Sequence, residues 1–369
     1  MSWLRLTLAH ISRTRGEWIA ALACFVGVIA VASWQGFGLG AGLALVGLFV
    51  GGFLSILIHE LGHALCAWAA GWRVWIISAL PVSLRLGHAP RFTTALGHDV
   101  GGFVLASPRT EKFETRWRSI VFTAGGPLAS LITGPLFIYW LTTFPPGMWE
   151  SQAAAGLLAG MLALAFHSSM SAAYTLWPLK FGDGRPNDMG MILAAAFAPQ
   201  PPPRESALIW AEALFAHGVE PQAWDEWIAA HVRAAALAPK PGPRASALGF
   251  ALALAEGDVQ RAQMIAEAGD HDVAHVLRGY LLAEAGQATR ADDALAAVID
   301  RANIAAAAPW RMLAIARIQA LTGAGASAQR AMDDFAEELA ESPTPQPFWE
   351  EALARTRHAI SAPASTARP

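Results

Sequence analysis

Long uncharged stretches dominate the first half of the chain. No Asp, Glu, Lys or Arg occurs between Trp18 and Ile58, between Ser119 and Trp149, or between Ser151 and Leu179. A helix needs about 20 consecutive apolar residues to cross the hydrocarbon core of a bilayer. The first uncharged stretch is long enough for two such helices. The pattern therefore predicts four transmembrane helices, over residues 18–34, 40–70, 119–143 and 153–177.

The basic residues predict how these helices are oriented. Residues 1–198 contain twelve Lys and Arg, and with four spans all twelve fall on the same side of the membrane. Because positively charged loop residues stay in the cytoplasm, we expect both termini and the segment 71–118 to be cytoplasmic. The chain is thus expected to be an integral, multi-pass protein of the inner or plasma membrane of the cell.

The composition changes near "APQPPPRE", residues 198–205. Residues 199–369 contain 14 Lys and Arg against 21 Asp and Glu, and they are rich in Ala with helical periodicity. Three stretches each combine small and apolar residues, a glycine turn and a second helix: "FALALAEGDVQRAQMIAE", "YLLAEAGQATRADDALAAV" and "IARIQALTGAGASAQRAMDDF". This pattern resembles a tetratricopeptide-like repeat array, and a generic helical bundle is the alternative.

These observations predict an all-α polytopic membrane protein with a soluble, tetratricopeptide-like C-terminal domain. A small β-rich segment at the membrane is expected within residues 72–118, where "WRVWIISALPVSLRLG" and "HDVGGFVLAS" have strand-like composition. The expected domains are 1–198 in the membrane and 199–360 in the cytoplasm, with 361–369 as a disordered tail. We expect the lipid bilayer and a protein bound to the C-terminal domain as partners, and no nucleic acid.

Two histidines and a glutamate interrupt the second predicted membrane helix. The sequence "HELGH" places His59 and His63 four residues apart, so both imidazoles lie on one face of a helix. That spacing lets both bind one Zn²⁺, with Glu60 placed to activate a metal-bound water. Titratable side chains inside a bilayer are costly and usually functional. The motif therefore predicts a zinc site in preference to a structural histidine pair.

Three motifs together resemble the site-2 protease family of intramembrane zinc metalloproteases, over residues 40–193. "HELGH" is similar to the family's zinc-binding helix, and "GGPLAS" to a Gly-Gly-Pro motif in a later span. "TLWP" followed by "LKFGDGRPNDMGMIL" is similar to an Asn-x-x-Pro and Asp-Gly element whose aspartate completes the zinc site. The resemblance implies a zinc endopeptidase that cleaves transmembrane segments of membrane-protein substrates, with Glu60 as general base.

The Gly-Gly-Pro motif implies a substrate-binding element made of Gly125, Gly126, Pro127 and Ser130. Glycines here could equally serve close helix packing. Ser130 and Thr175 stand where the family usually has asparagines that help to hold the substrate or polarise its carbonyl. These two replacements weaken the case for assigning the roles of the family's asparagines to Ser130 and Thr175. They do not affect the predicted zinc ligands.

Two aspartates are candidates for the third zinc ligand. Asp183 lies five residues after Pro178, and Asp188 directly precedes an apolar run, "MGMIL". As alternatives, Asp183 could be a turn residue and Asp188 a helix N-cap. We favour Asp188, because the apolar run can anchor it at the membrane edge, whereas Asp183 has Arg185 nearby as a partner in water.

His167 is a further titratable residue, deep in the fourth predicted span. It is either a packed polar residue or a group near the cleft that serves proton transfer or water access. The alternative to an enzyme is a non-catalytic membrane scaffold, stabilised by zinc and carrying a partner-binding repeat domain. Glu60 argues against a scaffold, since a purely structural zinc site needs no general base, whereas the two missing asparagines favour it.

Overall fold

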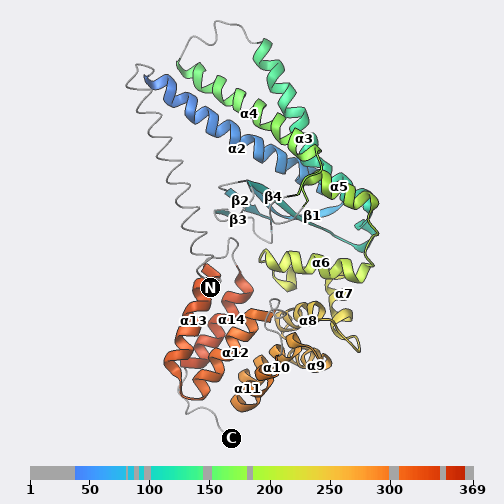
Figure 1. Cartoon of the computed structure of the whole chain (residues 1–369), viewed down its shortest axis with the longest axis vertical. Coiled ribbons are helices and arrows are strands. Elements are labelled where there is room, and N and C mark those ends of the chain that lie inside the picture. Colours follow the sequence, from blue (N-terminus) through green and yellow to red (C-terminus); the bar gives the residue numbers. More distant parts are fainter. Residues whose placement is uncertain are drawn as a thin grey trace. The chain divides into compact units, whose positions relative to one another are not determined.

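A computed structural model describes residues 38–79, 82–86, 91–94, 101–143, 152–180, 186–298, 307–340 and 346–361 (Figure 1). The chain divides into two compact units, Met1–Gln200 and Pro201–Pro369. The predicted span 18–34 and residue Asp183 lie outside the described residues, as does the predicted tail from residue 362 onward.

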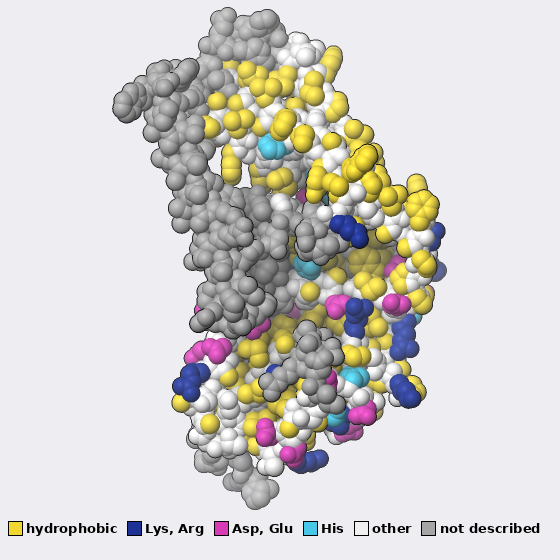
Figure 2. Space-filling view, in the orientation of Figure 1, with side chains coloured by type: hydrophobic (Ala, Val, Ile, Leu, Met, Phe, Trp, Pro, Cys, Tyr) yellow, Lys and Arg dark blue, Asp and Glu magenta, His cyan; other side chains and the backbone are white. Residues whose placement is uncertain are grey.

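Three long helices form the first unit: α2 (Gly38–Ala69), α3 (Arg116–Thr143) and α4 (Gln152–Leu176). Each contains a segment long and apolar enough to cross a membrane, which confirms three of the predicted spans. Large exposed apolar side chains cover them, for example Phe49, Ile132, Tyr139, Leu157 and Phe166. On the face shown in Figure 2, charged side chains lie away from this apolar surface. Such a surface suits contact with lipid.

Glycines let the three helices pack closely. A Cβ atom on Gly47 of α2 would lie 2.0 Å from the carbonyl oxygen of Gly156 in α4. A Cβ on Gly62 would lie 2.3 Å from the carbonyl oxygen of Gly125 in α3. At both positions the neighbouring backbone is too close for any side chain. Glycine therefore allows the backbone-to-backbone packing typical of membrane helices. Helix α2, which carries the "HELGH" sequence, therefore packs closely against both α3 and α4.

Helix α2 ends at a left-handed glycine and continues into a small sheet. Gly71 has φ +79°, and the guanidinium of Arg118 donates a hydrogen bond of 2.7 Å to the Ala70 carbonyl. The strands are β1 (Trp72–Ala79), β2 (Val82–Arg85), β3 (Arg91–Thr94) and β4 (Gly102–Pro108). They are ordered β3-β2-β1-β4 with antiparallel pairing throughout. The prediction of a β-rich segment is confirmed.

Two short helices complete the first unit. The 3₁₀ helix η1 (Glu111–Phe113) precedes α3, and the ten-residue helix α5 (Asp188–Phe197) follows α4. Helix α5 packs mainly against α3. Its first residue is one of the two candidate ligands, so the position of α5 sets the position of that carboxylate.

The described residues of the second unit form helices and their connecting turns. The helices are α6 (Pro203–Ala216), η3 (Pro221–Ala223), α7 (Glu226–Ala236), α8 (Pro243–Ala255), α9 (Val259–Ala268), α10 (Asp272–Glu284), α11 (Ala288–Ala296), α12 (Ala308–Leu321), α13 (Gly325–Ala340) and α14 (Pro347–Ser361). The three similar stretches form the hairpins α8–α9, α10–α11 and α12–α13, and Gly257, Gly286 and Gly323 in their turns all have positive φ. The helical content is as predicted, and the tetratricopeptide type stays a prediction.

Candidate metal centre

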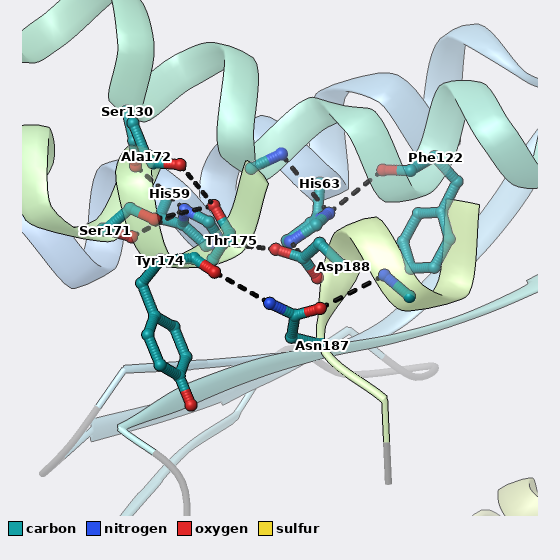
Figure 3. Close-up of polar contacts among 12 residues, drawn as sticks. His59, His63, Phe122, Ser130, Ser171, Ala172, Tyr174, Thr175, Asn187 and Asp188 are labelled. Carbon is teal, nitrogen blue, oxygen red and sulfur yellow. Dashed lines mark hydrogen bonds and ion pairs between the residues drawn. The ribbon is translucent and has the colours of Figure 1, made fainter. Parts of the chain in front are cut away.

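His59 and His63 lie one turn apart on α2, and Asp188 faces both of them from the start of α5 (Figure 3). Oδ2 of Asp188 is 3.2 Å from Nε2 of His59, and Oδ1 is 3.6 Å from Nε2 of His63. His59 and His63 are buried, each residue being 7% exposed. One ligand atom from each residue lies within 4.8 Å of the others, a grouping that could hold a metal ion.

Hydrogen bonds fix which nitrogen of each imidazole faces Asp188. Nδ1 of His63 is 3.0 Å from the carbonyl oxygen of Phe122 and 3.3 Å from the backbone nitrogen of Gly126, and in the tautomer with a proton on Nδ1 it donates to the carbonyl. Nδ1 of His59 lies 2.9 Å from the hydroxyl of Ser130 and 3.3 Å from that of Ser171. A protonated Nδ1 leaves the lone pair of Nε2 free for a metal, and metal-binding histidines are usually held by such a second bond.

The space between the ligands depends on Gly126. A Cβ atom at this position would lie 2.3 Å from Nε2 of His63 and 2.5 Å from Nε2 of His59. Only a residue without a side chain leaves the two nitrogens room for an ion. Two neutral imidazoles and one carboxylate form a donor set that suits Zn²⁺ and leaves one coordination position open. The residues present therefore fit a catalytic type of zinc site.

The charge of Asp188 is also suited to a cation. Burial raises the pKa of its carboxyl group, but when the imidazoles of His59 and His63 carry protons on Nε2, their hydrogen bonds outweigh burial and hold the pKa at about 2. Asp188 is therefore an anion at neutral pH. A partly buried anion of this kind is stabilised by a positive partner, which is a role for a metal ion.

Glu60 stands beside the three ligands and is not one of them. Its side chain is buried, at 6% exposed. It lines a cavity of about 800 Å³ together with His59, His63 and Asp188. The start of β4 closes in on it, since a Cβ on Gly102 would lie 2.7 Å from Oε1 of Glu60. The carboxylate thus borders the same cavity as the three candidate ligands.

Comparison with known families gives an independent result. The family model of peptidase family M50 matches residues 47–347. This chain belongs to peptidase family M50. That family contains the site-2 proteases, so the resemblance seen in the motifs is confirmed. No curated protein and no solved structure matches the chain.

Membership of M50 makes this protein an integral membrane protein of a metalloprotease family. Within this M50 peptidase, the structure brings together His59, Glu60, His63 and Asp188, all four predicted. Asp183 lies outside the described residues, so the comparison between the two aspartates stays a prediction.

The Gly-Gly-Pro element of the M50 peptidase lies in α3, next to the ligands. Ser130 contacts His59, Gly126 faces both imidazoles, and Gly125 packs against Gly62. Of the four predicted substrate-binding residues, none is among the described residues that line the cavity, and Pro127 is buried inside α3. Their role in substrate binding stays a prediction.

The residues that do line the cavity include several that the sequence did not single out. Ser171, Met170 and Tyr174 come from α4, and Phe103 and Val104 from β4. His167 lines the same cavity one turn before Ser171, and Thr175 lies one turn after it. The hydroxyl of Thr175 donates to the Ser171 carbonyl at 2.7 Å and so bonds to its own helix.

Asn187 is the other residue missed by sequence reasoning. It precedes Asp188 in "RPND", and its side chain bonds to both α4 and α5. The signal was present, because Asn directly before an apolar helix is a favoured N-cap. Its bonds to α4 could not be read from the sequence.

Proposed function

We propose that this M50 peptidase is an intramembrane zinc endopeptidase that cleaves transmembrane segments of membrane proteins. The proposal rests on one observation above all. His59, His63 and Asp188 form a group of candidate metal ligands, and Glu60 lines the same cavity without belonging to that group. The helix that carries His59, Glu60 and His63 is apolar enough to span a membrane. A structural metal site has no use for the extra carboxylate.

Each side chain has a distinct task in this reaction. Bound Zn²⁺ supplies a Lewis acid that makes a water nucleophilic near neutral pH and polarises a carbonyl. Glu60 accepts the proton from the attacking water and returns it to the leaving amine. Phe122, Ser130 and Ser171 hold the two imidazoles so that each Nε2 faces the ion.

We further propose that the chain crosses the membrane four times with both termini in the cytoplasm. The asymmetric distribution of Lys and Arg supports this arrangement. The helical C-terminal domain, tetratricopeptide-like by its repeated hairpins, would then bind a substrate or a regulatory protein in the cytoplasm. The scaffold alternative is less well supported, because the family is one of metalloproteases and Glu60 is present.

The test separates proton transfer from metal binding. Glu60→Gln removes the proton acceptor and leaves all three ligands in place, so the purified variant should keep its zinc but lose cleavage. His59→Ala and His63→Ala should lose both. Comparing membrane proteomes of wild-type and Glu60→Gln cells should show uncleaved substrates accumulating in the variant. An identical set of membrane fragments in both cell types would contradict the proposal and favour the scaffold.

A further inference from the structure

A single buried side chain joins the end of α4 to the start of α5. The amide nitrogen of Asn187 donates to the carbonyl oxygens of Tyr174 at 2.8 Å and Trp177 at 2.7 Å. Its amide oxygen accepts from the backbone nitrogens of Leu179 and Gly190, both at 3.1 Å. The side chain is buried, with Asn187 only 3% exposed.

These four bonds use the full hydrogen-bonding capacity of the amide. They also satisfy backbone groups that the ends of helices leave without partners. The bonds to Tyr174 and Trp177 cap the last turn of α4, while the bond from Gly190 caps the first turn of α5. The backbone nitrogen of Asn187 adds a bond of 3.0 Å to the Leu179 carbonyl. One residue thus fixes two helix ends against each other.

The residue after this double cap is the candidate third ligand. Asp188 is the first residue of α5, so its backbone position follows from where that helix begins. Figure 3 shows the Asn187 side chain next to Asp188 and bonded to the Tyr174 carbonyl of α4. A change in how α5 starts would therefore move the carboxylate relative to His59 and His63.

The body of α5 packs against α3, but it has few other polar anchors. The helix has ten residues, and none of them is classed as buried. Its far end is held by an exposed hydrogen bond of 2.9 Å from Arg116 of α3 to the Ala198 carbonyl. An exposed bond of this kind competes with water and contributes little to positioning. Asn187 is the buried polar anchor of the helix that carries Asp188.

We propose that Asn187 is a positioning residue for the metal site, which holds the Asp188 carboxylate within reach of both imidazoles. The proposal rests on the proposed function in that it takes Asp188 to be a zinc ligand. Residues that orient metal ligands typically change metal affinity about 10- to 100-fold when they are replaced. The bonds to Tyr174 and Trp177 are the decisive ones, since they fix the start of α5, where Asp188 lies, against the end of α4.

Two replacements separate the two caps. Asn187→Ala removes all four side-chain bonds. Asn187→Ser keeps an oxygen that can cap α5, because serine is a good N-cap, but it has no amide to donate to Tyr174 and Trp177. If the tie to α4 positions the ligand, both variants should bind zinc about 10- to 100-fold more weakly than the wild type. Wild-type affinity in Asn187→Ser would overturn the role of the α4 bonds.

The matched control removes a buried hydrogen bond made by α4, the helix to which Asn187 is bonded. The hydroxyls of Ser55 and Ser168 are 3.0 Å apart and link α2 to α4, yet neither is bonded to a ligand. Ser168→Ala should leave zinc affinity unchanged, whatever it does to the thermal stability of the metal-depleted protein. A loss of affinity in Ser168→Ala equal to that in Asn187→Ala would show that general loosening of the bundle explains the effect, and the proposal would be wrong.

The measurement is zinc binding by the full-length protein in detergent, in competition with a chromogenic chelator. Asp188→Asn is run in parallel to separate the two proposals. Wild-type zinc affinity in Asp188→Asn would contradict the ligand set itself. Weak binding in Asp188→Asn with wild-type binding in Asn187→Ala would overturn only the role of Asn187. If Asn187→Ala fails to fold, the Asn187→Ser variant decides the outcome.

Discussion

The hydroxyl of Ser130 lies 2.9 Å from Nδ1 of His59, although the two residues are 71 positions apart and belong to different helices. The family resemblance assigned residue 130 to substrate binding, because an asparagine usually stands there. In this chain the shorter hydroxyl is placed to orient a metal ligand. Ser171 of α4 approaches the same nitrogen at 3.3 Å, so His59 is held from α3 and α4 together.

Ser130→Ala should weaken zinc binding by about tenfold, the lower end of the range for residues that orient ligands. The loss should be moderate because Ser171 can still accept from Nδ1 of His59. Replacing Ser130 and Ser171 together should have a larger effect than either change alone. Chelator competition on the purified protein measures all three affinities.

Thr123→Val is the matched control for the Ser130 variant. Thr123 is a buried residue of the same helix, and its hydroxyl donates to the Ser119 carbonyl within α3. Its replacement should not alter zinc affinity. An unchanged affinity in the Ser130 and Ser171 double variant would show that these hydroxyls do not orient His59.

Gly126→Ala should abolish most zinc binding. The added methyl carbon would lie within 2.5 Å of both Nε2 atoms, so either the imidazoles or α3 must move. A misplacement of about 1 Å can cost about 100-fold in activity. Gly134→Ala, two turns further along α3, is the control, because there the new methyl meets mainly the movable hydroxyl of Ser169. Zinc analysis giving equal metal content in both variants would contradict the role of Gly126 as the space for the ion.

The sequence was sufficient where the relevant pattern is local. His59, Glu60 and His63 share one helical face through their spacing alone, and long uncharged runs marked the three confirmed spans. The β-rich segment also followed from local composition. Each of these features depends on residues only a few positions apart, where helix and strand geometry determine the outcome.

Contacts between distant helices could not be predicted. Ser171 reaches His59 across 112 positions, and Asn187 bonds to carbonyl oxygens of a preceding helix. Both depend on how α2, α3, α4 and α5 pack, and no periodicity in one segment encodes that packing. The same reason explains Gly126, which read as a packing or substrate residue but faces the imidazoles once α3 is packed on α2.

The predicted orientation can be checked with reporter fusions. Fusions after Arg118, Trp149 and Arg204 should report cytoplasmic, external and cytoplasmic locations, because the basic residues then all face the cytoplasm. The fusion after Arg118 is the cytoplasmic reference with which the other two signals are compared. An external signal after Arg204 would place the helical C-terminal domain on the opposite side of the membrane and would contradict the four-span prediction.

The third ligand can be decided by replacing each candidate aspartate with asparagine. Asparagine keeps the size of the side chain but loses the negative charge that helps to neutralise Zn²⁺, and its amide oxygen is a poorer ligand. Because Oδ1 and Oδ2 of Asp188 lie 3.6 Å and 3.2 Å from the two imidazoles, Asp188→Asn should be poor in zinc and inactive. Asn187 is the N-cap of α5 and Asp188 its first residue, so loss of a negative charge in the first turn alone would cost only about 0.3–1 kcal/mol.

Asp183→Asn is the matched variant, with the same chemical change five positions earlier. It should retain zinc and cleave the substrates that accumulate in Glu60→Gln cells at close to the wild-type rate. The reverse result, with Asp183→Asn poor in zinc and Asp188→Asn unaffected, would mean that the short spacing from Pro178 supplies the ligand. In that case the contact between Asp188 and the imidazoles would not be the one that binds the metal, and Asn187 would serve only to begin a helix.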